Sequence, residues 1–308
     1  MLKPPALREG DAVALIAPAG PLEGPEDLQR ACAAVEALGL RPRVGANALE
    51  RYGYLAGSDA QRAEDFNVAV RDPDIRAIFA MRGGYGTLRI LDLLDYGTLR
   101  ADPKVLLGYS DLTALLNAVS ARSDLVTFHG PVAAISPFTP MVVEALRRAI
   151  CVARPLGTLH VPEMETICGG TARGRLAGGN LSLLAALIGT PYAVDTLGTL
   201  LFFEDVDEAP YRIDRMLTQM RLSGGLGVAA GIVAGRFHNC DVPEEARTPG
   251  SFGSAQAIDD RLRDLAVPSL RGALIGHIEE QWTIPIGAWA TLDADARTLT
   301  IEEAAVDR

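Results

Sequence analysis

A serine at a tight corner of this chain combines a residue type and a setting suited to nucleophilic chemistry. Val105–Leu107 is a short apolar run typical of a buried strand, and from Asp111 onward the apolar residues recur at the spacing of one helical face. Ser110 lies in the corner between them. Such a corner pushes the hydroxyl out of the sheet, beside the free N–H groups at the start of the helix. It suits a nucleophile next to an anion site, although serine there is equally typical of a plain helix cap.

An acid and a histidine in the second half of the chain also follow apolar runs. Glu204 comes directly after Thr199–Phe203, and His277 ends the run Ala273–His277. In a serine hydrolase the imidazole takes the hydroxyl proton, while a carboxylate fixes the imidazole tautomer and offsets its positive charge. The sequence therefore offers Ser110, His277 and Glu204 as nucleophile, base and orienting acid.

Each member of this set has alternatives that the sequence leaves open. Chain order does not show that the three side chains meet, and a histidine on an apolar segment also fits a hydrogen-bonded core position. The competing acids are Asp205, Asp207 and Glu208, and the competing histidines are His129, His160 and His238.

A glycine-rich turn, Arg82-Gly83-Gly84-Tyr85-Gly86, follows the apolar run 77–81. It does not match a dinucleotide fingerprint, because Arg89 occupies the position of the third glycine. Glycines let a backbone approach a ligand closely and aim an N–H at it, and they also serve in ordinary tight turns. Arg82 and Arg89 flank this turn.

Composition excludes several classes of function. The chain has 308 residues, 48% of them apolar and 22% charged, which is enough for two domains or one large domain. Its net charge of −10 argues against a nucleic-acid partner. No apolar run is long enough to span a membrane, and the first residues lack the apolar core of a signal peptide, so we expect a cytoplasmic protein.

Metal and cofactor sites are not expected either. The four cysteines are scattered without C-x-x-C spacing, which favours free thiols in a reducing compartment. The segment after His277 does not form an H-E-x-x-H helix, and no phosphate-binding loop motif is present.

Apolar runs of strand length alternate with helical patterns through the first half of the chain, which predicts a parallel sheet covered on both faces. The predicted strands are 12–17, 41–44, 77–81, 105–107, 125–131, 199–203, 231–235 and 273–277, with a closing hairpin at 287–292 and 298–301. The predicted helices lie near 28–38, 59–70, 88–94, 112–119, 141–149, 183–188, 213–222 and 258–265, and 238–253 is a polar loop. Ligands of such sheets bind beyond the carboxyl ends of the strands, where Gly83, Gly84 and Ser110 would lie.

A Pro- and Gly-rich stretch divides the chain. We expect an N-terminal α/β domain over 1–155, a linker over 156–171 and a C-terminal domain over 172–308.

In its motifs the chain resembles the LD-carboxypeptidases, serine peptidases that trim cell-wall muropeptides. Six segments carry the resemblance in the same order over nearly the whole chain. They are Arg82-Gly83-Gly84-Tyr85-Gly86, Gly108-Tyr109-Ser110-Asp111, Phe128-His129-Gly130-Pro131, Gly178-Gly179-Asn180-Leu181, Glu204-Asp205 and Gly276–Gly287.

The resemblance implies a Ser-His-Glu triad at Ser110, His277 and Glu204, with an oxyanion hole that we place at the N–H groups of Gly84 and Asp111. It implies an N-terminal parallel-sheet α/β domain and a smaller C-terminal mixed α/β domain with the active site between them, commonly in a homodimer. The implied reaction releases D-alanine from a murein tetrapeptide or muropeptide during cytoplasmic recycling of peptidoglycan, without metal or cofactor. A carboxypeptidase must also recognise a free carboxylate, and Arg82 is the predicted cation. Tyr85 and Asn180 are further predicted substrate contacts, because both lie beside glycine turns.

Two other functions stay open. A sister branch, similar to the microcin immunity proteins, uses the same triad on acylated nucleotide-like antibiotics. That branch tends to carry extra length and an aromatic loop; Trp282 and Trp289 are the only tryptophans here, and no inserted loop is visible. A non-catalytic, two-lobed protein that binds a small ligand is the alternative from a different class.

Overall fold

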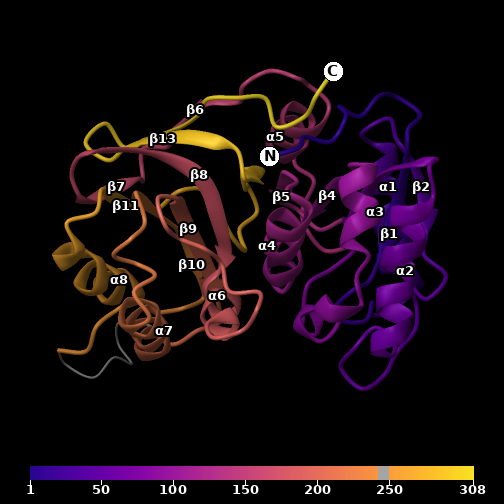
Figure 1. Ribbon diagram of the computed structural model, residues 1–308. Helices are drawn as coiled ribbons and strands as arrows, with labels where there is room; N and C mark the ends of the chain where they lie inside the picture. The colour runs from indigo at the N-terminus through magenta and orange to yellow at the C-terminus, as the bar shows by residue number, and fades with distance from the viewer. Residues whose placement is uncertain (242–249) are drawn as a thin grey trace. The chain divides into compact units, whose positions relative to one another are not determined.

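The computed structural model describes residues 1–241 and 250–308, which divide into two compact units (Figure 1). Unit 1 consists of Met1–Pro155, Trp282–Gly287 and Ala304–Arg308. Unit 2 consists of Leu156–Gln281 and Ala288–Glu303. Two short segments from the end of the chain thus belong to unit 1, whereas the sequence prediction assigned all of 172–308 to the C-terminal domain.

The sheet of unit 1 is parallel except at one edge. In spatial order its described strands are β12 (Ile284–Ile286), β5 (Thr127–His129), β4 (Val105–Gly108), β3 (Ile75–Ala80), β1 (Ala12–Ile16) and β2 (Arg41–Val44). Only β12 runs antiparallel to its neighbour. Every residue of β1 and β4 is buried, as expected for strands covered on both faces. The predicted N-terminal α/β domain is confirmed.

The helices of unit 1 are α1 (Pro25–Glu36), α2 (Asp59–Arg71), α3 (Tyr96–Ala101), α4 (Leu112–Ser123) and α5 (Pro140–Ile150). Helix α2 begins at a capping box formed by Ser58 and Gln61. The helix predicted near 88–94 is wrong, because the structure has two 3₁₀ turns, η1 (Thr87–Arg89) and η2 (Leu91–Leu93). Its leucines recur every three residues, which is the period of a 3₁₀ helix.

The sheet of unit 2 is mixed, in agreement with the predicted C-terminal mixed domain. Across it, the described strands are β6 (Gly157–Leu159), β14 (Thr298–Ile301), β13 (Trp289–Asp293), β8 (Thr171–Asn180), β9 (Leu200–Val206), β10 (Gly231–His238), β11 (Ser269–Arg271) and β7 (Glu165–Cys168). The central four, β8 to β11, are parallel, and the flanking strands pair antiparallel. Because β6 and β7 lie within 156–171, the segment that we expected to be a linker supplies two strands of unit 2.

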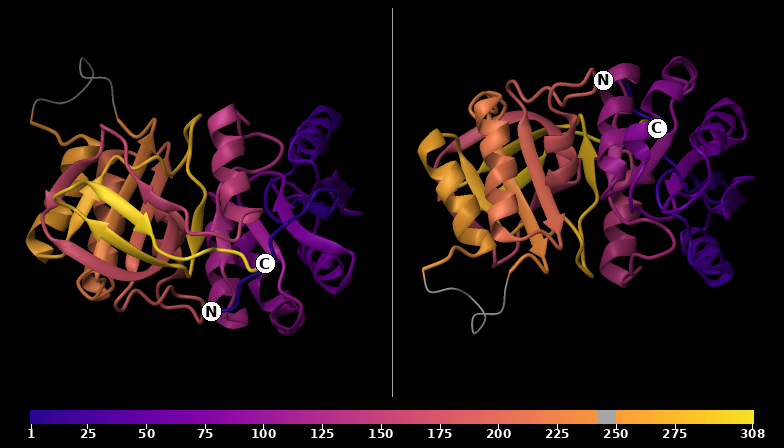
Figure 2. Two further views of the ribbon diagram at one scale, coloured as in Figure 1. Left: turned by 90° about the horizontal axis from the view of Figure 1, so that it is seen from above. Right: turned by 90° about the horizontal axis from the view of Figure 1, so that it is seen from below.

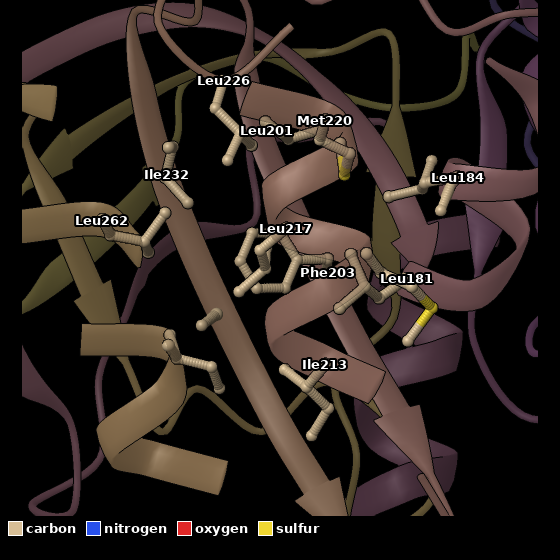
Figure 3. Packing of buried hydrophobic residues seen from close by; sticks show 14 of the residues in the cluster. Leu181, Leu184, Leu201, Phe203, Ile213, Leu217, Met220, Leu226, Ile232 and Leu262 are labelled. Carbon is tan, nitrogen blue, oxygen red and sulfur yellow. The ribbon is translucent and has the colours of Figure 1, made fainter. Parts of the chain in front are cut away.

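Helices α6 (Leu181–Leu187), α7 (Pro210–Leu222) and α8 (Ser254–Leu262), with the short turn η4 (Arg263–Leu265), accompany this sheet (Figure 2). Their apolar residues share one buried cluster with β9 and β10, so the helices cover one face of the sheet (Figure 3). Phe203, Leu217 and Ile232 are fully buried in that cluster. This core fixes the position of β9, the strand that carries Glu204.

The strand predicted over Ala273–His277 is wrong. Strand β11 ends at Arg271, and the residues that follow have no regular structure. Gly272 and Gly276 have φ values of 88° and 127°, far from the φ of about −120° to −140° that is typical of strand residues. Of the predicted polar loop 238–253, residues 242–249 lie outside the described ranges. Among the helices that the structure does describe, none has the length and apolarity needed to cross a bilayer.

Replacing Leu217 by alanine should lower the free energy of unfolding by about 2–5 kcal/mol, because it removes a fully buried side chain from the core of unit 2. Leu222→Ala is the matched control, since Leu222 lies on the same helix with 84% of its surface exposed. That change should stay within about 0.5 kcal/mol of wild type. Urea denaturation followed by circular dichroism measures both, and equal effects would contradict this account of the core.

Candidate active site

Ser110 occupies the turn between β4 and α4 in a strained backbone conformation. Its φ is 63°, in the left-handed region that side chains other than glycine avoid at a cost of about 1–3 kcal/mol. The N-cap of α4 is Asp111, which makes no side-chain capping bond, so capping does not explain the serine. A strained serine at a strand-to-helix turn is the arrangement in which a hydroxyl is exposed as a nucleophile.

The turn after β3 lies against this serine. A Cβ atom added to Gly83 would lie 2.9 Å from the Ser110 Cβ, 3.0 Å from its Oγ and 3.6 Å from the Asp111 nitrogen. Any side chain at position 83 would therefore displace the hydroxyl. Within the described part of the chain, neither the Asp111 N–H nor the Gly84 N–H donates to a protein acceptor. Both predicted oxyanion donors thus lack an acceptor among the described residues.

Two buried hydrogen bonds tie the glycine turn to the serine turn. The Thr87 N–H donates to the Asp111 carboxylate at 2.8 Å, and the Thr87 hydroxyl donates to the Asp111 carbonyl oxygen at 2.5 Å. Burial raises the pKa of the Asp111 carboxyl, while the bonds from Thr87 and the charge of Arg62 oppose the rise. We call this pair of bonds the Thr87–Asp111 latch.

Arg62 anchors the far end of the same turn. Its guanidinium is fully buried and donates to the carbonyl oxygens of Gly86 at 2.9 Å and Pro18 at 2.5 Å, and it pairs with Asp59. No motif of the sequence points to Thr87 or Arg62. Their bonds to Asp111, Gly86 and Pro18 join groups at least 24 residues apart, so no local spacing signals them.

In unit 2, Glu204 and His277 form a hydrogen-bonded pair. Glu204 lies on β9 with no exposed surface, and its Oε2 is 2.7 Å from Nδ1 of His277. A proton on Nδ1, donated to the carboxylate, leaves the lone pair of the ring on Nε2, the form needed in a general base. A Cβ on Gly276 would lie 2.9 Å from both Cβ and Oε2 of Glu204, so only glycine permits this approach.

The competing acids have other partners. The Asp205 carboxylate accepts hydrogen bonds from the Asn180 side chain and from the backbone and hydroxyl of Ser182, at the start of α6. Burial raises the pKa of Asp205, and these bonds oppose the rise. Asp207 accepts from Asn239, and Glu208 pairs with Arg212. Glu204 is the acid of this group whose bond to His277 the structure shows.

The competing histidines are set in other surroundings. His129 is buried on β5 with its ring edge-to-face against Tyr109. His160 bonds the carbonyl oxygen of Arg297, and His238 is exposed at the end of β10. No group of three or more potential metal ligands occurs among residues 1–241 and 250–308.

The predicted substrate contacts fall into two settings. Arg82 and Tyr85 line a pocket of about 680 Å³ in unit 1, together with Gly84. Asn180 is buried in unit 2, where its carbonyl oxygen caps α6 by accepting from Leu183 and its amide donates to Asp205. These contacts are those of a residue that positions α6.

Comparison with known proteins identifies the family of the chain. Residues 13–130 match the LD-carboxypeptidase N-terminal domain, and residues 173–292 match the LD-carboxypeptidase C-terminal domain. The chain is 39% identical to a Bacillus subtilis protein named Probable murein peptide carboxypeptidase, over 97% of this chain and 94% of that one.

Solved structures support the same family. A muramoyltetrapeptide carboxypeptidase from Oxalobacter formigenes matches with a TM-score of 0.83 and 28% identity, over 95% of this chain and 99% of that one. The chain is also 28% identical to the Microcin C7 self-immunity protein MccF of Escherichia coli, over 81% of this chain and 80% of that protein. With both halves matched in order and a relative at this level of identity along nearly its whole length, the chain belongs to the LD-carboxypeptidase family and is a serine-type carboxypeptidase.

Proposed function

We propose that this protein releases the terminal D-alanine from murein tetrapeptides, with Ser110 as nucleophile, His277 as general base and Glu204 as the acid that orients it. The observation that carries the proposal is the bond between the buried Glu204 carboxylate and Nδ1 of His277. It supplies the acid–base half of a serine-hydrolase triad. The murein substrate is supported by the names of the relatives in Bacillus subtilis and Oxalobacter formigenes.

In the proposed reaction, Ser110 Oγ attacks the carbonyl carbon before D-alanine while Nε2 of His277 takes the hydroxyl proton. The C–N bond then breaks, and His277 returns the proton to the amine of the departing D-alanine. Water, activated by the same imidazole, hydrolyses the acyl ester and restores the serine.

We assign the N–H groups of Gly84 and Asp111 as the donors that bind the oxyanion of each tetrahedral intermediate. One such donor lowers the activation barrier by about 3 kcal/mol. The Thr87–Asp111 latch supports this assignment, because it holds the turns that carry the two donors in register. Thr87 is thus a positioning residue.

We place this reaction in cytoplasmic recycling of wall peptides, carried out by a homodimer. A second candidate is hydrolysis of an acylated nucleotide, favoured by the identity to MccF. A structure of MccF holds glutamyl sulfamoyl guanosine, so incubation of this protein with that compound tests the second candidate directly.

Ser110→Ala should lower D-alanine release from a murein tetrapeptide by about 10⁴-fold or more, because the nucleophile is lost. Mass spectrometry of the peptide measures the reaction, and an unchanged circular dichroism spectrum shows that the variant is folded. A fluorophosphonate should label wild type at Ser110 and fail to label the variant. Retained turnover in Ser110→Ala would remove the assignment of the nucleophile.

Glu204→Gln should lower kcat by about 10³–10⁴-fold, because the amide no longer holds His277 in the required tautomer. Asp207→Asn is the matched control: it makes the same chemical change at an exposed acid three positions along and should leave kcat unchanged. Steady-state kinetics on the tetrapeptide distinguish them, and equal activity of the two variants would exclude Glu204 as the orienting acid.

Thr87→Val should lower kcat by about 5–10-fold with little change in KM, since it removes one buried hydrogen bond that positions the oxyanion donors. Thr87→Ser keeps the hydroxyl and should restore kcat. A loss that serine does not rescue would mean that the shape of threonine, not its bond to Asp111, is what matters.

A further inference from the structure

The pocket beside the glycine turn is built from the carboxyl-end loops of three neighbouring strands. Glu23 follows β1, Arg51 and Tyr54 follow β2, and Arg82, Gly84 and Tyr85 follow β3. In the sheet, β3 pairs with β4, the strand before Ser110, on one side and with β1 on the other. The glycine turn therefore stands between the pocket and the serine turn.

Two guanidinium groups in the pocket are held by consecutive residues of one loop. Arg82 donates through Nη1 to the Pro21 carbonyl oxygen at 2.8 Å, and Arg51 donates through Nη2 to the Leu22 carbonyl oxygen at 2.9 Å. Each bond uses one of the five N–H donors of its guanidinium. Among the described side chains, no carboxylate forms an ion pair with either group. The pocket thus holds two cations that have donors left for a ligand.

The charges and walls of the pocket favour a small anion attached to an apolar group. Glu23 is the one acid among its lining residues, so the cations exceed the acids by one. Tyr54 and Tyr85 stand edge-to-face, with ring centroids 5.5 Å apart, and provide an apolar wall. Paired N–H donors of a guanidinium match the two oxygens of a carboxylate.

The position of the pocket suits one particular carboxylate. In a peptide cleaved before its last residue, only the amide nitrogen and one Cα separate the scissile carbonyl carbon from the terminal carboxylate, a span of about 4 Å. The site for that carboxylate must therefore adjoin the oxyanion donor. Gly84, the donor in the proposed reaction, lines the pocket, and Arg82 precedes it by two residues.

We infer that this pocket binds the free C-terminal carboxylate of the substrate through Arg82 and Arg51, with Tyr54 and Tyr85 packed against the side chain of the terminal residue. The inference rests on the proposed function, because it takes Gly84 as an oxyanion donor. The two arginines then determine the specificity for peptides whose last residue, the one released, has a free carboxylate.

Calorimetry with the Ser110→Ala protein tests this independently of turnover. The ligands are a murein tetrapeptide and the same peptide with a C-terminal carboxamide, which has the same shape without the charge. The Ser110→Ala protein should bind the acid at least 10-fold more tightly than the amide. Adding Arg82→Gln or Arg51→Gln should weaken binding of the acid by about 10–100-fold and leave binding of the amide nearly unchanged.

Arg43→Gln is the control, since it removes one positive charge from an exposed position on β2 outside the pocket. It should leave both dissociation constants unchanged. Equal loss of acid and amide binding in the Arg82 and Arg51 variants, or no binding of either peptide to the Ser110→Ala protein, would overturn the inference. Failure of the proposed function is a separate result: wild-type protein that releases no D-alanine from the tetrapeptide.

Discussion

A buried carboxylate needs a partner, and that requirement determines the surroundings of Glu204 in unit 2. Glu204 has no exposed surface, and in the described structure its Oε1 has no hydrogen-bond partner, so the bond from His277 to Oε2 is its main compensation. Burying a charge without a partner costs several kcal/mol. A proton on Nδ1 of His277 is therefore strongly favoured over the other tautomer. The same close approach depends on Gly276, because a Cβ atom at that position would lie 2.9 Å from Oε2 of Glu204.

Unit 1 meets a different requirement by a different means. The proposed nucleophile and its two proposed N–H donors have to converge, and Ser110 adopts a left-handed conformation packed against Gly83. The Thr87–Asp111 latch and the Arg62 anchor then restrain the two turns with buried hydrogen bonds. Strain and buried polar groups are both unfavourable for stability, and they persist where the surrounding structure determines them. In each unit the costly features lie at the proposed catalytic residues.

The sequence predicts the Ser110 turn well because two local signals meet there: an apolar run of strand length and a helical period that begins right after it. Glu204 is proposed from one signal only, the apolar run before it, and β9 in fact continues through it to Val206. His277 is proposed from a run whose predicted strand is wrong. Ala273–Ile275 has the composition of a strand, but the flanking Gly272 and Gly276 both have positive φ values, and Gly276 packs against Glu204. The roles of Thr87, Arg62 and β12 depend on partners distant in the chain, and no local pattern encodes them.

Asn180 shows how a local signal can be correct and its interpretation incomplete. Its position after two glycines suggested a substrate contact, yet an asparagine just before an apolar helical period is also a typical N-cap, and that is the role that its contacts describe. Through Asp205 the same cap is bonded to the end of β9, one residue beyond Glu204. Asn180 thus holds the residue next to Glu204, the proposed orienting acid.

The division of labour in unit 1 follows from the order of its strands. Loops after β1 and β2 supply one side of the pocket, and the turn after β3 supplies the other side together with the proposed donor Gly84. The turn after β4 carries the proposed nucleophile, Ser110. The latch joins only the latter two turns. Residues such as Arg51 and Tyr54 can therefore change with the substrate while Ser110, Gly84 and Asp111 keep their geometry. In the proposed carboxylate site, Arg51 and Tyr54 come from a loop outside the two latched turns, whereas Arg82 shares its turn with Gly84. A substitution at position 51 should therefore disturb the proposed oxyanion donors less than one at position 82.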